Sequence, residues 1–201
     1  MVAEQSSVSP ARAGYRMLRR AQQVEETRRR IVAAAVGLHG SVGPANTTVS
    51  AIAEAAGVTR VTVYSHFPDE DALFAACTAH WAAHQRMPDP AGWRAISAPE
   101  DRAKAALTDL YRFFHEAAPM LTLTTRDREV LPDFVRQRNE QTSQTQMDAL
   151  LGAWQPKQRT KRRRALVGHA LSFATWRSLC VDQALSRRDA VAAMTRLIVD
   201  C

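Results

Sequence analysis

The chain has 201 residues, of which 46% are hydrophobic and 23% are charged, and its formal net charge is +7. This apolar content is enough for a sizeable core, so the composition excludes a wholly disordered chain. No run approaches 18 apolar residues and no signal-peptide pattern opens the chain, so we expect a cytoplasmic protein without a membrane partner. The three cysteines are too few and too scattered for a disulfide framework or a zinc site.

The positive charge is concentrated in two stretches. Of the 27 Lys and Arg residues, 13 lie within residues 10–30 and 157–164, and the rest of the chain carries a net negative charge. The segment 31–85 contains Arg60 as its only basic residue, against four acidic ones. The run from 157 to 164 is interpreted as a solvated helix face, with an acidic neighbour or an anion as the alternative.

Helical periodicity recurs along the chain and predicts an all-α fold. Ile31, Ala35 and Leu38 fall on one face of a helix predicted over 25–39, which Gly40 and Gly43 end. Residues 1–24 are predicted to be a basic flexible arm, and 86–99 a loop with three prolines. Further helices are predicted at about 70–86, 99–117, 128–152, 160–183 and 187–200.

Residues 48–67 predict two short helices joined by a tight turn. Thr48 is a good N-cap for the first helix, Gly57 suits the left-handed turn, and Thr59 caps the second helix. In that second helix, Val63 and Phe67 lie four residues apart and are predicted to pack against the preceding helix. The spacing leaves Arg60, Thr62 and Tyr64 facing outward.

This arrangement is typical of a helix-turn-helix, whose second helix enters the major groove of DNA. Spacing alone leaves a helical hairpin inside a larger core as an equal alternative. The residues themselves favour the first interpretation. The pairs Ile52-Ala53, Val63-Tyr64 and His66-Phe67, together with Ala56-Gly57-Val58, closely resemble the DNA-binding domain of TetR/AcrR-family regulators over about residues 25–85.

The resemblance implies an N-terminal three-helix DNA-binding domain over 25–85 and a larger helical ligand-binding and dimerisation domain over 86–201. It also implies a homodimer bound to double-stranded DNA at a palindromic operator, with neither an enzymatic activity nor a cofactor. A repressor released from its operator by a small, largely apolar effector is the function expected. An effector-independent repressor or an architectural protein is the alternative.

The resemblance also assigns roles to individual residues. Thr48, Tyr64 and His66 would contact phosphates, and the major groove would be lined by Thr59, Arg60, Val61 and Thr62. Two positions depart from the family pattern: Val61 stands where glycine is frequent, and Glu70 where a phosphate-binding lysine is frequent.

Because Glu70 cannot neutralise a phosphate, we expect the basic residues that precede the motif to contribute to DNA binding. These are Arg28 to Arg30 and the basic arm, which is expected to fold against DNA; a merely solvated tail is the alternative.

Aromatic residues of the middle helices are candidates for an effector pocket, although aromatic residues at helical spacing are also typical of a packed core. The candidates are Trp81, Phe113, Phe114, Met120, Phe134, Phe173 and Trp176. His80 and His84 lack a third ligand at a recognisable spacing, so no metal is predicted. No nucleotide-binding, hydrolase or metalloprotease motif is present, and an enzyme is therefore not expected.

Overall fold

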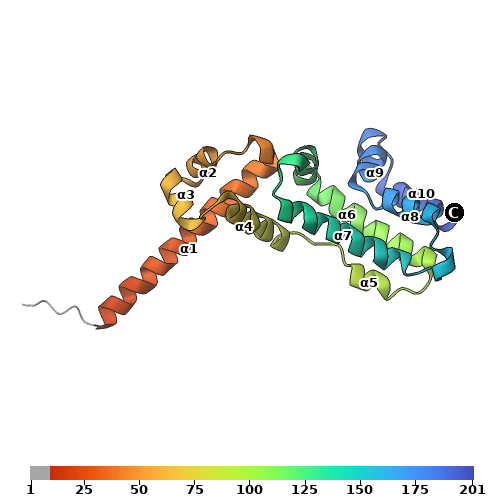
Figure 1. Cartoon of the computed structure of the whole chain (residues 1–201), viewed down its shortest axis with the longest axis horizontal. Helices are drawn as coiled ribbons and strands as arrows, with labels where there is room; N and C mark the ends of the chain where they lie inside the picture. The colour runs from red at the N-terminus through yellow and green to blue at the C-terminus, as the bar shows by residue number, and fades with distance from the viewer. Residues whose placement is uncertain (1–9) are drawn as a thin grey trace, which may run out of the picture.

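The protein is all-helical along the part described by the structure, a computed structural model that covers residues 10–201 (Figure 1). The N-terminal half contains α1 (Pro10–Ser41), η1 (Pro44–Asn46), α2 (Val49–Ala56), α3 (Arg60–His66) and α4 (Glu70–Ala83). The rest contains α5 (Pro90–Arg94), α6 (Pro99–Arg126), η2 (Arg128–Val130), α7 (Asp133–Leu151), η3 (Pro156–Gln158), α8 (Lys161–Ala170), α9 (Phe173–Arg177), η4 (Ser178–Asp182) and α10 (Arg187–Val199). The predicted fold class is confirmed.

Several boundaries differ from the sequence-based prediction. Residues 10–24 are helical and continue α1, whereas a flexible arm was predicted there; residues 1–9 of that arm lie outside the described part. Proline at the first helical position and a run of good helix formers favour this helix, although its apolar residues have no core to face. The loop predicted at 86–99 contains the short helix α5, and the helix predicted over 160–183 breaks where Ser172 caps α9.

Pro119 lies inside α6 instead of ending it, and the segment 121–124 therefore belongs to the same long helix. Proline removes one backbone hydrogen bond, which leaves the carbonyl group of His115 without its helical donor. Both His115 and Pro119 are exposed, so water can hydrate that carbonyl group. Ser186 caps the last helix, since its side chain accepts from the backbone N–H of Asp189 at 3.1 Å.

Two hydrophobic cores form, one in each half of the chain. The first joins α1 to α4 around Ile31, Ile52 and Phe67. The second joins the later helices around Leu107, Leu150 and Ile198. Helix α4 takes part in both, because its residues Leu73 and Cys77 belong to the first core while Trp81 packs on the second. The two cores thus meet along α4.

Buried polar contacts hold the second core together. The Tyr111 hydroxyl on α6 donates to the carbonyl group of Ala170 at 3.0 Å, which joins α6 to the end of α8. Arg102 is buried and donates to three carbonyl groups, those of Ile96, Ala149 and Arg94. A buried polar group is costly unless it is hydrogen-bonded, so these bonds fix the helices in one arrangement.

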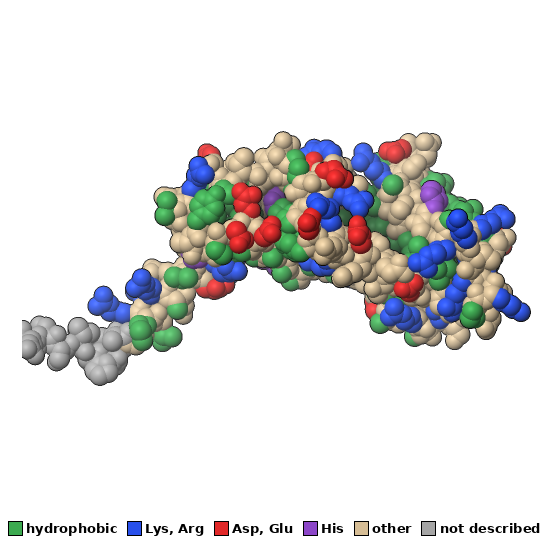
Figure 2. Space-filling model, in the orientation of Figure 1, with side chains coloured by type: hydrophobic (Ala, Val, Ile, Leu, Met, Phe, Trp, Pro, Cys, Tyr) green, Lys and Arg blue, Asp and Glu red, His purple; other side chains and the backbone are tan. Residues whose placement is uncertain are grey.

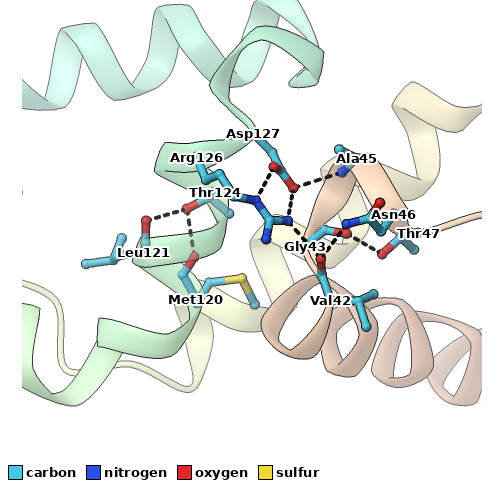
Figure 3. A network of polar contacts seen from close by, with 10 residues as sticks. All are labelled: Val42, Gly43, Ala45, Asn46, Thr47, Met120, Leu121, Thr124, Arg126 and Asp127. Carbon is cyan, nitrogen blue, oxygen red and sulfur yellow. Dashed lines mark hydrogen bonds and ion pairs between the residues drawn. The ribbon is translucent and has the colours of Figure 1, made fainter.

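The two halves meet where the end of α6 contacts the turn after α1 (Figure 3). Asp127 accepts from the backbone N–H of Ala45 at 3.0 Å, and Arg126 donates to the carbonyl group of Val42 at 2.9 Å. The two side chains also form an ion pair at 2.6 Å. We call these four residues the interdomain clamp.

Gly43 lies at the centre of the clamp, with a φ angle of 91°. A Cβ atom at this position would collide with the side chains of Arg126 and Asp127. Glycine is therefore required both by the backbone conformation and by the closeness of the two side chains. The Asp127 side chain is only 6% exposed. Hydrogen bonding from Arg126, and then from the Ala45 N–H, holds the pKa of this carboxyl group below its ordinary value of 3.8.

We expect Asp127→Asn to lower the thermal unfolding midpoint at neutral pH. The midpoint of this variant should also fall less than that of the wild type as the pH is lowered. Because the folded-state pKa is depressed, the carboxylate stabilises the protein fully above its unfolded pKa of about 4, and this contribution is lost as the pH falls through the depressed pKa. An amide still accepts from Ala45 but does not attract the guanidinium of Arg126.

Thermal melts between neutral pH and about pH 3 measure this effect, with Asp200→Asn as a control at an exposed carboxylate. An identical pH profile for wild type and Asp127→Asn would contradict it.

Candidate nucleic-acid interface

Helices α2 and α3 form the two-helix unit predicted from the sequence. The Thr48 side chain accepts from the backbone N–H of Ala51 at 3.1 Å and begins α2. Gly57 ends that helix in the left-handed conformation, with φ 64° and ψ 41°. The Thr59 side chain then accepts from the N–H of Thr62 at 3.1 Å and begins α3. Both caps and the glycine turn are confirmed.

The inner face of this unit rests on α1. Ile52, Val63 and Phe67 are buried in one core with Ile31 and Ala35 of α1. The predicted packing of Val63 and Phe67 on the preceding helix is thereby confirmed. Because three helices share this core, the angle between α2 and α3 is set by side-chain packing as well as by the glycine turn.

The outer face of α3 carries the residues predicted to read DNA. Thr59, Arg60, Val61 and Tyr64 are exposed, with Val61 at 79% and Tyr64 at 43%. Thr62 is half-buried, and its hydroxyl lies 2.9 Å from that of Thr59. A valine so exposed near a helix start has apolar surface available to a partner such as a thymine methyl group.

The remaining predicted phosphate contacts flank this face. Thr48 is exposed at the start of α2, and His66 is half-buried in the last turn of α3. A surface cleft of about 560 Å³ runs beside α3, and its lining includes Thr48, Arg60 and Tyr64. The structure thus brings these predicted residues to one side of the domain.

Arg28 has an intramolecular role in the structure. Its guanidinium donates to the carbonyl group of His66 at 3.1 Å and stacks 4.3 Å from the ring centre of Phe67. Arg28 therefore holds the end of α3 against α1, and the contact with phosphate predicted for it would compete with these bonds.

The sequence did not single out Arg30 from its neighbours. Arg30 is exposed, and one of its guanidinium nitrogens lies 3.9 Å from the position that a Cβ atom on Gly57 would take.

Acidic residues surround the same domain, and Figure 2 shows several of them on one face of this part of the molecule. Asp69 caps α4 by accepting from the N–H of Ala72 at 2.7 Å, and Glu70 and Asp71 occupy the first turn of that helix. Carboxylates at this position stabilise the positive end of the helix dipole. Glu70 therefore fits α4 well, although it removes positive charge from the candidate interface.

Most of the candidate effector residues form one aromatic cluster in the second core. Phe114, Phe173 and Trp176 lie 5.3–6.1 Å apart between ring centres, and Trp81 lies 6.2 Å from Phe113. The indole N–H of Trp176 is buried without a hydrogen-bond partner among the described residues. A buried donor without a partner is costly, so a ligand that accepts from it would gain from binding there.

Two candidate residues lie elsewhere. Met120 lies at the contact between α6 and α1, where its methyl carbon is 3.4 Å from the place of a Cβ atom on Gly40. Phe134 is half-buried on α7 and is not among the residues packed on the second core. The sequence could not separate these two from the cluster, because helical spacing does not show which helices face one another.

Comparison with known proteins shows what the N-terminal part of the chain resembles. Residues 31–77 match the family model described as bacterial regulatory proteins, tetR family. A segment of 53 residues, 26% of the chain, is 43% identical to the HTH-type transcriptional regulator AcrR of Shigella flexneri, and it covers 25% of that protein's length.

Solved structures extend the likeness of the fold to most of the chain. A TetR-family transcriptional regulator from Streptomyces coelicolor shares 20% identity at a TM-score of 0.59, over 88% of this chain and 78% of that one. A TetR-like transcriptional regulator from Rhodococcus sp. RHA1 shares 18% identity at a TM-score of 0.59, over 86% and 93% respectively.

The fold and the exposed second helix define a helix-turn-helix protein with a helical body. The matched family model and the AcrR relative make the assignment more specific for the N-terminal half: residues 31–77 form a helix-turn-helix domain of the tetR family type, and the chain spans only a quarter of the length of the regulator AcrR that it matches. No helix of residues 10–201 combines the length and the apolar character needed to cross a membrane.

We expect Gly57→Ala to destabilise the protein by about 1–2 kcal/mol, because a side chain disfavours the left-handed conformation of the turn. The matched control is Gly37→Ala in an exposed part of α1, where a Cβ atom would meet nothing within 4 Å. That change should stabilise the protein by about 0.5–1 kcal/mol through helix propensity. Urea unfolding measures both variants, and equal stabilities would contradict the assigned turn geometry.

Proposed function

We propose that the protein is a dimeric, sequence-specific repressor that releases its operator when a small, largely apolar effector binds the second core. The observation that carries the proposal is the exposed outer face of α3, from Thr59 to Tyr64, on a helix-turn-helix of TetR type. The long helix α6 supports the regulatory part, since it contacts both halves of the molecule.

The chemistry of the outer face suits base recognition and backbone contact. Arg60 can donate two hydrogen bonds to guanine, and Val61 and Thr62 present methyl groups suited to thymine. Thr48, Tyr64 and His66 carry donors at the edges of the unit, where the phosphates of a bound duplex would lie. Base contacts would give specificity, and phosphate contacts would set the register.

A homodimer follows from the proposed mode of binding. The last helices present an outward face that includes exposed apolar residues, Val181 beside α9 and Leu197 on α10. Pairing of these helices with those of a second copy would cover this face. Two recognition helices would then lie about one duplex turn apart, roughly 34 Å, and would read a palindromic operator.

Helix α6 connects the proposed effector site to the proposed DNA-binding unit. Phe113 and Phe114 lie near its middle in the aromatic cluster, and Arg126 and Asp127 at its end hold the turn after α1. A ligand that separates the cluster would shift α6, and the interdomain clamp would carry that shift to the helix-turn-helix. Release requires differential affinity, about tenfold for each 1.4 kcal/mol between the two states.

The second candidate function is a repressor or architectural protein without an effector. The close packing of the aromatic rings favours it, because large aromatic side chains fill cores as readily as they line binding sites.

We expect Arg60→Ala to weaken binding to an operator selected from random duplex DNA by roughly 5- to 150-fold, the value of one bidentate base contact. Base preference should relax at one position of each half-site. Tyr64→Phe should weaken all sequences alike, by roughly 2- to 10-fold, because it removes one hydrogen bond to phosphate. Fluorescence anisotropy measures both, with exposed Lys157→Ala as the control. Full affinity in both variants would show that α3 does not read the DNA.

We expect an apolar ligand found by a thermal-shift screen to raise the unfolding midpoint by roughly 5–10 °C at a hundred times its Kd. Trp176→Phe should reduce this shift, because it removes the buried indole N–H from the cluster. Trp93→Phe is the matched control, since the indole N–H of Trp93 already donates to Asp109 at 3.1 Å. If no compound of a broad apolar panel shifts the midpoint, this result would contradict the effector and support the effector-independent alternative.

A further inference from the structure

The helix-turn-helix domain lacks the positive charge that binding to duplex DNA demands. Residues 31–85 contain Arg60 as their only basic residue, against Glu54, Asp69, Glu70 and Asp71. All four carboxylates are exposed, so their negative charges would repel the phosphates of a bound duplex. Because affinity for DNA depends on neutralised phosphates, another part of the chain has to supply cations to the interface.

The N-terminal end of α1 carries such cations away from the body of the molecule. Figure 1 shows this helix projecting well beyond α3, and Figure 2 shows Lys and Arg side chains along it. Residues 14–24 contain Arg16, Arg19 and Arg20 and no acidic residue. All three arginines are exposed, and none forms an ion pair with a carboxylate of the described residues.

The arginines lie on one side of the helix. At about 100° per residue, Arg16, Arg19, Arg20 and Arg30 fall within a sector of about 100°. We call these four residues the arginine stripe. The other two arginines of residues 14–30 lie outside the sector and have partners, because Arg28 bonds to the carbonyl group of His66 and Arg29 pairs with Glu26.

The arginine stripe shares a side with the helix-turn-helix. Arg30, at its C-terminal end, lies beside Gly57, the turn between α2 and α3. From Arg30 the stripe runs back along α1 to Arg16, a distance of about 21 Å at 1.5 Å per residue. A duplex seated on the start of α3 would therefore have the stripe alongside it for more than half a helical turn of DNA.

We propose that the arginine stripe binds the phosphate backbone of the duplex next to the bases read by α3, and so supplies the positive charge that the helix-turn-helix lacks. This inference rests on the proposed function. A duplex is the occupant favoured by charge, because the stripe is purely cationic while the domain beside it has a net charge of −3 over residues 31–85.

The opposing possibility is a second copy of the chain. Tyr15, Met17 and Leu18 are exposed on other sides of the same helix, and apolar side chains of this kind can pair two helices. Pairing through these residues would not need the arginines. Substitution of the arginines should therefore weaken the binding of a duplex but not the pairing with a second copy.

The test compares salt dependence of operator binding for the wild-type protein and the triple variant Arg16→Ala, Arg19→Ala, Arg20→Ala. Each lost phosphate contact lowers the slope of log K against log salt by about 0.9, so a dimer that loses six contacts should lose about 5 from its slope. A variant with lysine at the three positions should keep most of the slope. Alanine is the best helix former, so circular dichroism and the unfolding midpoint should stay unchanged.

The matched control removes three exposed cations from the other basic stretch, through Lys157→Ala, Lys161→Ala and Arg162→Ala. It changes the net charge by the same amount but should leave the slope unaltered. A wild-type slope in the Arg16, Arg19 and Arg20 variant would overturn the inference, as would an equal loss in the control. Failure of the wild-type protein to bind any selected duplex would instead overturn the proposed function.

Discussion

Helix α1 is tied to the rest of the molecule at the turn that follows it, and the position of the DNA-binding unit depends on that tie. Asp127 and Arg126, at the end of α6, bond to backbone groups on both sides of Gly43. The contact is tight enough that a side chain at Gly43 would collide with both partners. Since α2 and α3 pack with α1 in one core, a displacement of α6 relative to this turn would also displace α3, the recognition helix of the proposed function. Coupling between domains requires an element of this kind that both sites can bias.

The electrostatics of the DNA-binding half reflect two demands on the same residues. Asp69, Glu70 and Asp71 stabilise the start of α4, whose residues Leu73 and Cys77 complete the first core. Carboxylates that suit the helix start weaken the attraction between this domain and DNA. The division of roles among the neighbouring arginines follows. Arg28 holds the end of α3 through His66 and Phe67, whereas the arginine stripe forms no ion pair with a described carboxylate and is proposed to bind phosphate.

The second core combines buried polar contacts with a cluster of aromatic side chains. Arg102 and Tyr111 use their polar groups on backbone carbonyl groups, so they tie α6 to its neighbours at defined points. The aromatic cluster includes one unsatisfied group, the indole N–H of Trp176. The proposed release requires a shift of α6, so an effector would have to move this helix against the hydrogen bonds of Arg102 and Tyr111.

Local chemistry determined the parts of this protein that the sequence by itself could predict. The caps at Thr48 and Thr59, the left-handed Gly57 and the buried pair Val63 and Phe67 are set by neighbours within a few residues, so the pattern predicted two short helices and a tight turn. The resemblance of the residues to a known family was needed to interpret this pair as a helix-turn-helix. The all-helical fold followed from the same periodicity. Helix propensity also favoured the extension of α1, although the weak apolar pattern of residues 10–24 hid it.

Only the tertiary structure decided which distant groups meet. Contacts between Asp127 and Ala45, or between Arg28 and His66, join residues 82 and 38 positions apart, and no spacing rule relates them. For the same reason the sequence could not separate Met120 and Phe134 from the aromatic cluster, nor show that Pro119 would be tolerated in an exposed turn of α6. Residue types and periods specify what each segment is able to contact, whereas the packing of whole helices determines which contacts form.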